Sequence, residues 1–195
     1  MLLKNKNIFP FLLILILSFS LTNAQTEDEI LAGKMRVSPK ASVSETIGFT
    51  NVTIDYGRPG VKGRKIWDGL VPYDKLWRAG ANEATKFTFS NDVNIAGHNF
   101  KKGSYSFFAI PGKNEWTLIF NNVADQWGPF TYNEAKDEFR FKVKPAENDH
   151  WQEWLAYCFT DIKVQPVGKI NSAVVNLEWA KLKVPFKIEV ATSKK

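Results

Sequence analysis

The chain has 195 residues, a formal net charge of +6 and a single cysteine. That length fits one domain with a sizeable core, and the single cysteine excludes a disulfide within the chain. The positive charge is mild and spread along the sequence, so we expect no nucleic-acid partner.

The first 24 residues have the organisation of a secretory signal peptide. Lys4 and Lys6 precede an apolar run at 8–21, and Thr22 and Ala24 put small residues where a signal peptidase reads them. The apolar run is shorter than the roughly 20 residues that a membrane-spanning helix needs. We therefore expect cleavage after Ala24, export to the periplasm or beyond, and no membrane span in the mature chain.

The segment that follows predicts a single β domain. Residues 25–40 are polar and mixed in charge, which predicts a tether. From residue 41 to 192, short runs alternate apolar and polar side chains, as half-buried antiparallel strands do. In chain order these runs lie at 43–49, 52–56, 87–89, 93–95, 105–109, 116–120, 139–143 and 175–190. We predict an antiparallel β-sandwich of about nine or ten strands.

The segment 148–158 fits two kinds of element. Trp151, Trp154 and Leu155 have the spacing of a short helix that a polar residue at its start would cap. From Gln152 onward the same residues also fit a strand, with Leu155 and Tyr157 facing inward. We favour the strand.

The C-terminal run contains a shift of parity. Its apolar residues occupy odd positions as far as Trp179 and even positions from Leu182. One strand cannot keep both sets on one face, so we predict a β-bulge near Ala180 and Lys181 that absorbs one residue.

The longest segment without a period of 2 or 3.6 is 57–84. Connections of this length in compact domains are usually functional or disordered. Trp67, Tyr73 and Trp77 supply too much apolar surface for a solvated linker. We therefore predict an ordered loop laid over the β scaffold.

Six residues of this loop are candidates for ligand binding. Arginine can clamp an anionic group, asparagine and glutamate exchange hydrogen bonds with hydroxyls, and tryptophan offers a flat apolar face. The set therefore fits a glycan or a small anionic or polar ligand. The alternative is that the same groups only fix the loop to the domain through internal ion pairs. The six candidates are Arg58, Arg64, Trp77, Arg78, Asn82 and Glu83.

A second candidate loop spans residues 121–137. Trp127, Phe130 and Tyr132 lie there among polar residues. Exposed aromatics on the rim of a sandwich can form a carbohydrate platform, and they can equally cover the end of the core.

Catalytic patterns are sparse. Two histidines, one cysteine and scattered carboxylates give no metal-ligand spacing, and there is no nucleophile elbow, so we expect neither metal nor cofactor. A hydrolase-like enzyme would use Glu83 or Asp55, with Arg78 as an electrostatic clamp. Glycosidase chemistry needs two carboxyl groups beside one bond, which requires Asp55 and Glu83 to meet in space. Non-enzymatic ligand binding is the first hypothesis, a hydrolase the second, and a purely architectural loop the third.

Four stretches together resemble a known family. They are GRPGVKGRKIWDGLVPYDKLWRAGANEAT at 57–85, KKGSYSFFAIPGKNEWTLIFN at 101–121, QWGPFTY at 126–132 and LEWAKLKVPFKIEV at 177–190. Over nearly the whole mature chain, the sequence resembles the secreted bacterial proteins grouped as domain-of-unknown-function family 2911. The resemblance implies an exported all-β protein. It assigns no catalytic residue, because the function of the family is not established.

Overall fold

The computed structural model describes residues 35–166 and 169–191. Contacts divide the chain into residues 1–36 and 37–195. Only Met35 and Arg36 of the first unit are described, and all the strands belong to the second. The predicted signal peptide and most of the predicted tether lie outside the described residues. Within the described ranges, no helix is long and apolar enough to cross a membrane.

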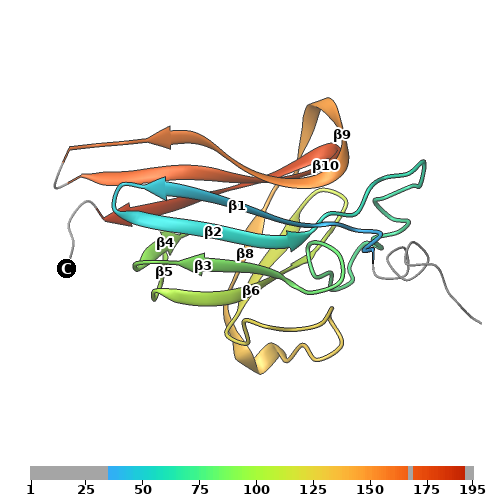
Figure 1. Cartoon of the computed structure of the whole chain (residues 1–195), viewed down its shortest axis with the longest axis horizontal. Helices are drawn as coiled ribbons and strands as arrows, with labels where there is room; N and C mark the ends of the chain where they lie inside the picture. Colours follow the sequence, from blue (N-terminus) through green and yellow to red (C-terminus); the bar gives the residue numbers. More distant parts are fainter. Residues whose placement is uncertain (1–34, 167–168, 192–195) are drawn as a thin grey trace, which may run out of the picture. The chain divides into compact units, whose positions relative to one another are not determined.

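Two antiparallel sheets make up the domain, as the sequence predicts (Figure 1). One sheet has six strands in the order β1-β2-β3-β6-β7-β8, and the other has four in the order β5-β4-β10-β9. The strands are β1 Lys40–Ile47, β2 Thr50–Gly57, β3 Thr85–Phe89, β4 Val93–Ile95, β5 His98–Phe100, β6 Gly103–Ile110, β7 Trp116–Asn121, β8 Asp137–Val143, β9 Ala146–Lys163 and β10 Ile170–Ala191. In the described part of the chain, the helical structure is a single 3₁₀ turn at Glu134–Lys136.

The core lies between the two sheets because one face of each strand is apolar. Phe87, Phe107 and Phe120 come from β3, β6 and β7 and are fully buried. The ring of Phe186 on β10 meets them at centroid distances of 5.9, 5.7 and 6.2 Å. Burying one such side chain stabilises a fold by about 1.5–3 kcal/mol, so this contact is a main source of the attraction between the sheets.

Both uncertain elements of the C-terminal half take the predicted form. The segment 148–158 is strand, within a longer β9 that starts at Ala146. The pairing of β9 with β10 shifts register on both sides of Ala180, whose φ of 55° lies in the left-handed region. The predicted bulge near Ala180 is therefore confirmed.

Two boundaries at β1 were predicted wrongly. Lys40 belongs to the strand rather than to the tether, because it pairs with Gly57. The strand ends at Ile47 rather than Phe49, because Gly48 has a φ of 61° and reverses the chain. Phe49 lies in the turn and is 54% exposed.

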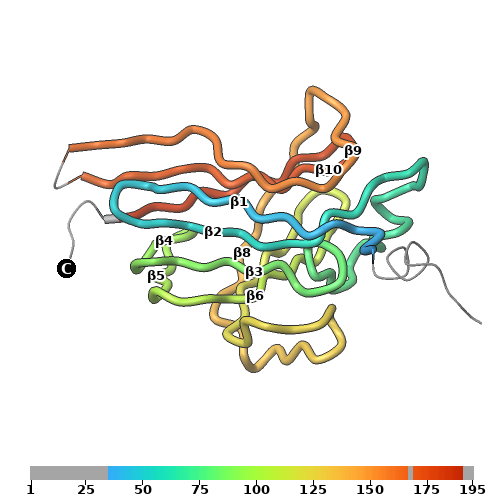
Figure 2. Tube along the Cα trace, viewed as in Figure 1, coloured from blue at the N-terminus to red at the C-terminus, as the bar shows by residue number. Residues whose placement is uncertain are grey.

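The long loop between β2 and β3 is ordered and holds both sheets. Figure 2 follows its path from the end of β2 to the start of β3. The backbone amides of Trp77 and Ala109 each donate to the other's carbonyl at 2.8 Å, and the amide of Val61 donates to the carbonyl of Glu153 at 2.8 Å. Trp67 also packs edge-on against Trp116 at a centroid distance of 4.9 Å. The loop therefore closes one end of the sandwich.

Candidate ligand-binding pocket

A pocket of about 250 Å³ lies where β2 and β3 meet the loop 122–133. Its floor comes from the two strands and its wall from the loop. The lining residues that can contribute to recognition are Lys40, Asp55, Glu83, Lys86, Gln126 and Trp127.

The floor is set by strand alternation. Asp55 on β2 and Lys86 on β3 are direct cross-strand partners. Their chain neighbours Ile54 and Phe87 are fully buried in the core. Successive side chains of a strand point to opposite faces, so Asp55 and Lys86 stand on the outer face of the sheet.

The wall is a segment that pairs with the chain just before β3. The backbone amide of Ala84 donates to the carbonyl of Gln126 at 2.9 Å, and Glu83 forms an antiparallel bridge with Trp127. An ion pair of 3.0 Å joins Lys86 on β3 to Asp125 of the loop. These contacts bring two segments that are distant in the sequence into one pocket.

Gln126 fixes the wall to the sheet. It is 7% exposed, and its side-chain nitrogen donates to Ser106 Oγ on β6 and to the carbonyl of Val123, each at 2.9 Å. Its side-chain oxygen has no donor among the described residues. A buried amide held in this way makes the wall rigid at the point nearest the sheet.

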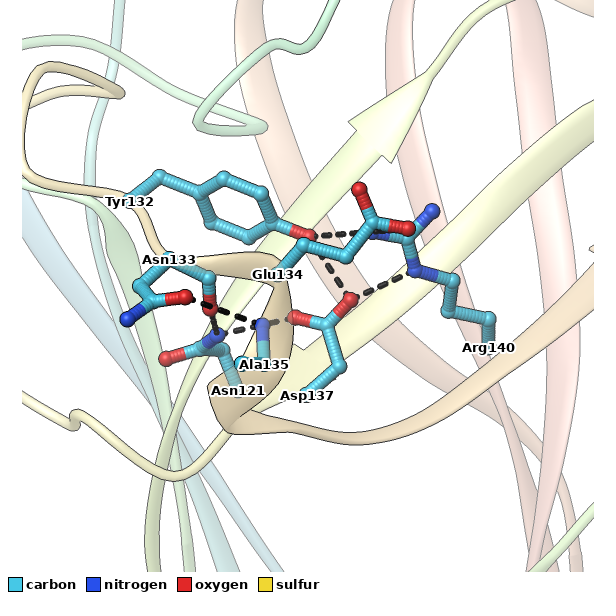
Figure 3. A network of polar contacts seen from close by, with 7 residues as sticks. All are labelled: Asn121, Tyr132, Asn133, Glu134, Ala135, Asp137 and Arg140. Carbon is cyan, nitrogen blue, oxygen red and sulfur yellow. Dashed lines mark hydrogen bonds and ion pairs between the residues drawn. The ribbon is translucent and has the colours of Figure 1, made fainter.

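A second network fixes the far end of the same loop (Figure 3). Asp137 accepts hydrogen bonds from the hydroxyl of Tyr132 at 2.7 Å and from Nε of Arg140 at 2.5 Å. Its other oxygen accepts from Nδ2 of Asn121 at 2.8 Å. Burial, followed by the bond to Asp137, raises the pKa of Tyr132. The loop is thus anchored on both sides of Trp127.

Trp127 is the exposed aromatic residue of the pocket wall. Its side chain is 59% exposed, although a large apolar group normally gains from burial. Asp55 and Glu83 supply carboxylate acceptors in the same pocket, and Lys40 supplies an ammonium donor. The pocket therefore offers a flat apolar face beside both kinds of hydrogen-bonding group.

Of the six predicted binding residues, Glu83 is the one that lines this pocket. Arg58 donates from Nε to the carbonyl of Leu155 at 2.9 Å. Arg64 donates to the carbonyls of Val61 at 3.1 Å and Gly60 at 2.6 Å. The two arginines thus bind backbone oxygens, where the alternative interpretation expected carboxylates.

The other three predicted residues do not line the pocket. Trp77 packs into the closed end of the sandwich and donates to the carbonyl of Gly80 at 3.2 Å. Arg78 donates to the carbonyl of Asn82 at 3.3 Å, and burial lowers its pKa. The side chain of Asn82 donates to the carbonyl of Ser38 at 3.4 Å. A ligand-binding role for these residues stays a prediction.

Sequence reasoning misses the two lysines, Asp125 and Gln126. The sequence places Lys40 in a polar segment and indicates for Lys86 only the outward position of a strand. Trp127 is found through its aromatic character among polar residues. Within residues 35–166 and 169–191, no group of three or more His, Cys, Asp or Glu side chains could hold a metal ion.

The comparisons with known proteins identify a family. The family described as "Protein of unknown function (DUF2911)" matches residues 38–188, a range that includes every residue of the pocket. The expected resemblance to family 2911 is therefore confirmed, and export stays a prediction. Neither the curated proteins nor the solved structures contain a match.

Proposed function

We propose that this chain, which belongs to the DUF2911 family, binds a sugar unit or a similar hydroxyl-rich small molecule in its pocket without transforming it. The observation that carries the proposal is the exposed Trp127 on the wall of a pocket that also contains the carboxylates of Asp55 and Glu83. Carboxylates accept hydrogen bonds from hydroxyls, and an indole face covers the apolar C–H side of a sugar ring.

The size of the pocket supports a small ligand. Pockets that bury drug-sized molecules span about 300–1,000 Å³. A volume of about 250 Å³ lies just below that range and suits a single ring. The lysines at 40 and 86 add donors for ring or hydroxyl oxygens.

We also propose that this binding takes place outside the cytoplasm. The support is the predicted signal peptide at residues 1–24. Mass spectrometry of the protein made in a Gram-negative host should find a chain that starts at Gln25. Recovery of the full-length chain in the inner membrane would contradict export.

The test of the binding proposal compares the parent with Glu83→Gln and Trp127→Ala. Glucose, xylose and N-acetylglucosamine serve as probes, with titration calorimetry and thermal melting as readouts. A ligand at about a hundredfold excess over its Kd stabilises the folded state by about 2.7 kcal/mol, which is an easily measured rise in Tm. We expect that rise in the parent and its loss in both variants.

Trp151→Ala is the matched control, because Trp151 is 54% exposed on β9 and does not line the pocket. It should bind each probe as the parent does. Unchanged binding in Glu83→Gln and Trp127→Ala would contradict the proposal and leave the architectural role of the loop as the better account.

A hydrolase remains the second candidate, and one observation favours it. Asp55 and Glu83, the two carboxylates that the hydrolase hypothesis requires, line one pocket. A glycosidase uses such a pair as acid and as base or nucleophile. Incubation with oligosaccharides and analysis of the products decides the matter. Formation of product by the parent, abolished in Glu83→Gln although the variant still binds the sugar, would establish a hydrolase. Absence of product would leave sugar binding without catalysis as the proposed function.

A further inference from the structure

We infer that the ligand is a chain of neutral sugar residues that runs from the pocket along the outer face of β1, β2, β3 and β6. This inference rests on the proposed function and specifies its ligand as a polymer. It is carried by a row of hydroxyl side chains that begins where the pocket floor ends. The row, called here the hydroxyl row, consists of Ser44, Thr53, Thr88 and Ser104.

The hydroxyl row is fixed by the register of four neighbouring strands. Ser44 pairs with Thr53, Thr53 with Thr88, and Thr88 with Ser104. Neighbouring strands lie about 4.7–4.9 Å apart, so the row crosses the sheet as an evenly spaced line. In Figure 1, β1, β2, β3 and β6 run side by side in this order.

The hydroxyl row continues the floor of the pocket. Thr53 is two residues from Asp55 on β2, and Thr88 is two residues from Lys86 on β3. Residues two apart on a strand share a face and are about 6.6 Å apart. A sugar chain that leaves the pocket along the strands therefore meets the row directly.

The opposite direction is covered. Ser106 lies two residues after Ser104 on β6. It is buried and accepts a hydrogen bond from the side chain of Gln126 in the wall. Beyond it Phe108 and Ile119 form an apolar cluster against which Leu76 packs. The face of β1 to β3 is thus the open side of the pocket.

The row is uncharged and its hydroxyls are held in place. Oγ atoms of Ser44 and Thr53 lie 3.1 Å apart, and those of Thr88 and Ser104 lie 2.9 Å apart. The side-chain oxygen of Asn51 accepts hydrogen bonds from Ser44 at 3.0 Å and from Thr53 at 2.9 Å, so that pair keeps only acceptor positions for a further partner. The Thr88–Ser104 pair keeps one donor as well as acceptor positions. A polar outer face is ordinary for an antiparallel sheet. This face differs because it ends at a pocket with an exposed tryptophan. The pocket would hold one end of the sugar chain, and the rest of the chain would extend over the hydroxyl row.

The test measures how affinity depends on chain length. Cello-, xylo- and chito-oligosaccharides from monosaccharide to hexasaccharide are titrated against the exported chain and against the double variant Thr53→Val, Thr88→Val. Valine keeps the shape and favours strands, so the fold should persist, which a thermal melt verifies. For the series that binds, we expect parent affinity to rise about tenfold with length, as one or two added hydrogen bonds would give. The double variant should bind the monosaccharide normally and lose that rise.

The matched control is Thr117→Val, which removes a half-buried hydroxyl from β7 outside the row and the pocket. It should keep the full dependence on length. Equal affinity for monosaccharide and hexasaccharide in the parent would overturn the inference and leave the proposed function standing. Preferential binding of polygalacturonate, an acidic polymer, would overturn the inference that the sugar chain is neutral. Absence of binding to every probe would overturn the proposed function and the inference with it.

Discussion

Asp137 anchors the far end of the loop that forms the pocket wall. Its side chain is 9% exposed and accepts hydrogen bonds from Asn121, Tyr132 and Arg140. Hydrogen bonds to a charged group contribute about 1.5–3 kcal/mol each when the partner is removed, although values within one network do not add. The loop that carries Trp127 is therefore held by a buried acceptor rather than by surface charge.

We expect Asp137→Ala to lower the free energy of unfolding by at least about 1.5–3 kcal/mol, because three donors lose their acceptor. Asp125→Ala is the control, since its ion pair with Lys86 involves a carboxylate that is 85% exposed. Exposed pairs contribute under about 1 kcal/mol. Urea denaturation of both variants measures the difference, and equal losses would argue against the anchoring role of Asp137.

Glu138 makes stability depend on acid pH. It lies on β8 and is hydrogen-bonded to His98 of β5 at 3.0 Å, so it joins an edge of one sheet to an edge of the other. That bond, with a second from Asn122, lowers the pKa of Glu138 below the ordinary value of 4.5. A carboxyl group with a lowered folded-state pKa contributes stability above its unfolded pKa, and the contribution is lost as pH falls through the folded value.

The parent should therefore lose more stability than Glu138→Gln as the pH is lowered from about neutral to below 4.5. Thermal melts of both proteins across that range provide the measurement. The two Tm curves should converge in acid. Curves that stay parallel through the whole range would show that the bond to His98 does not alter the titration of Glu138.

At the scale of elements, the sequence was most informative where one face of a strand is apolar. Alternation predicted every described strand except the short β5, and the change of parity between Trp179 and Leu182 predicted the bulge at Ala180. It failed at Phe49, because an apolar residue in a turn continues the alternation without belonging to the strand. The hydrophobic pattern reports which residues are apolar, and glycine dihedrals decide where the chain turns.

The junction between β2 and the long loop depends on Gly57. A Cβ atom there would lie 2.2 Å from the carbonyl oxygen of Ala81, which is backbone and cannot rotate away. Overpacking of this kind costs about 1–3 kcal/mol, so Gly57→Ala should lower Tm and disturb the pocket that Gly57 lines.

Gly63→Ala is the control, because there the added methyl group meets no neighbour and only the backbone dihedral angle is strained. Its φ is 69°, and no described atom lies within 4 Å of the added carbon. We expect a loss of about 1–2 kcal/mol without any effect on ligand affinity. If Gly57→Ala melted no lower than Gly63→Ala and bound the probes equally well, the close approach at Ala81 would not be a constraint.

At the scale of the whole molecule, the pocket is a product of tertiary structure. Its residues come from the start of β1, from β2, from the end of the long loop, from β3 and from the loop 122–133. The sequence indicated Glu83 and Trp127 as members of two separate loops, and only the pairing of those loops places them together. In the sequence, Arg58 and Arg64 were binding candidates on the same grounds as Glu83. Their side chains instead donate to backbone carbonyls, through contacts that no local sequence pattern encodes.

We predict that a sugar ligand protects the pocket formed by β2, β3 and the loop 122–133 from solvent exchange. Hydrogen–deuterium exchange of the protein, with and without cellohexaose, xylohexaose or chitohexaose, provides the measurement. We expect slower exchange in residues 51–57, 83–89 and 124–127 with the hexasaccharide that binds. Slower exchange confined to residues 58–71, around Arg58 and Arg64, or no change with any of the three, would contradict it.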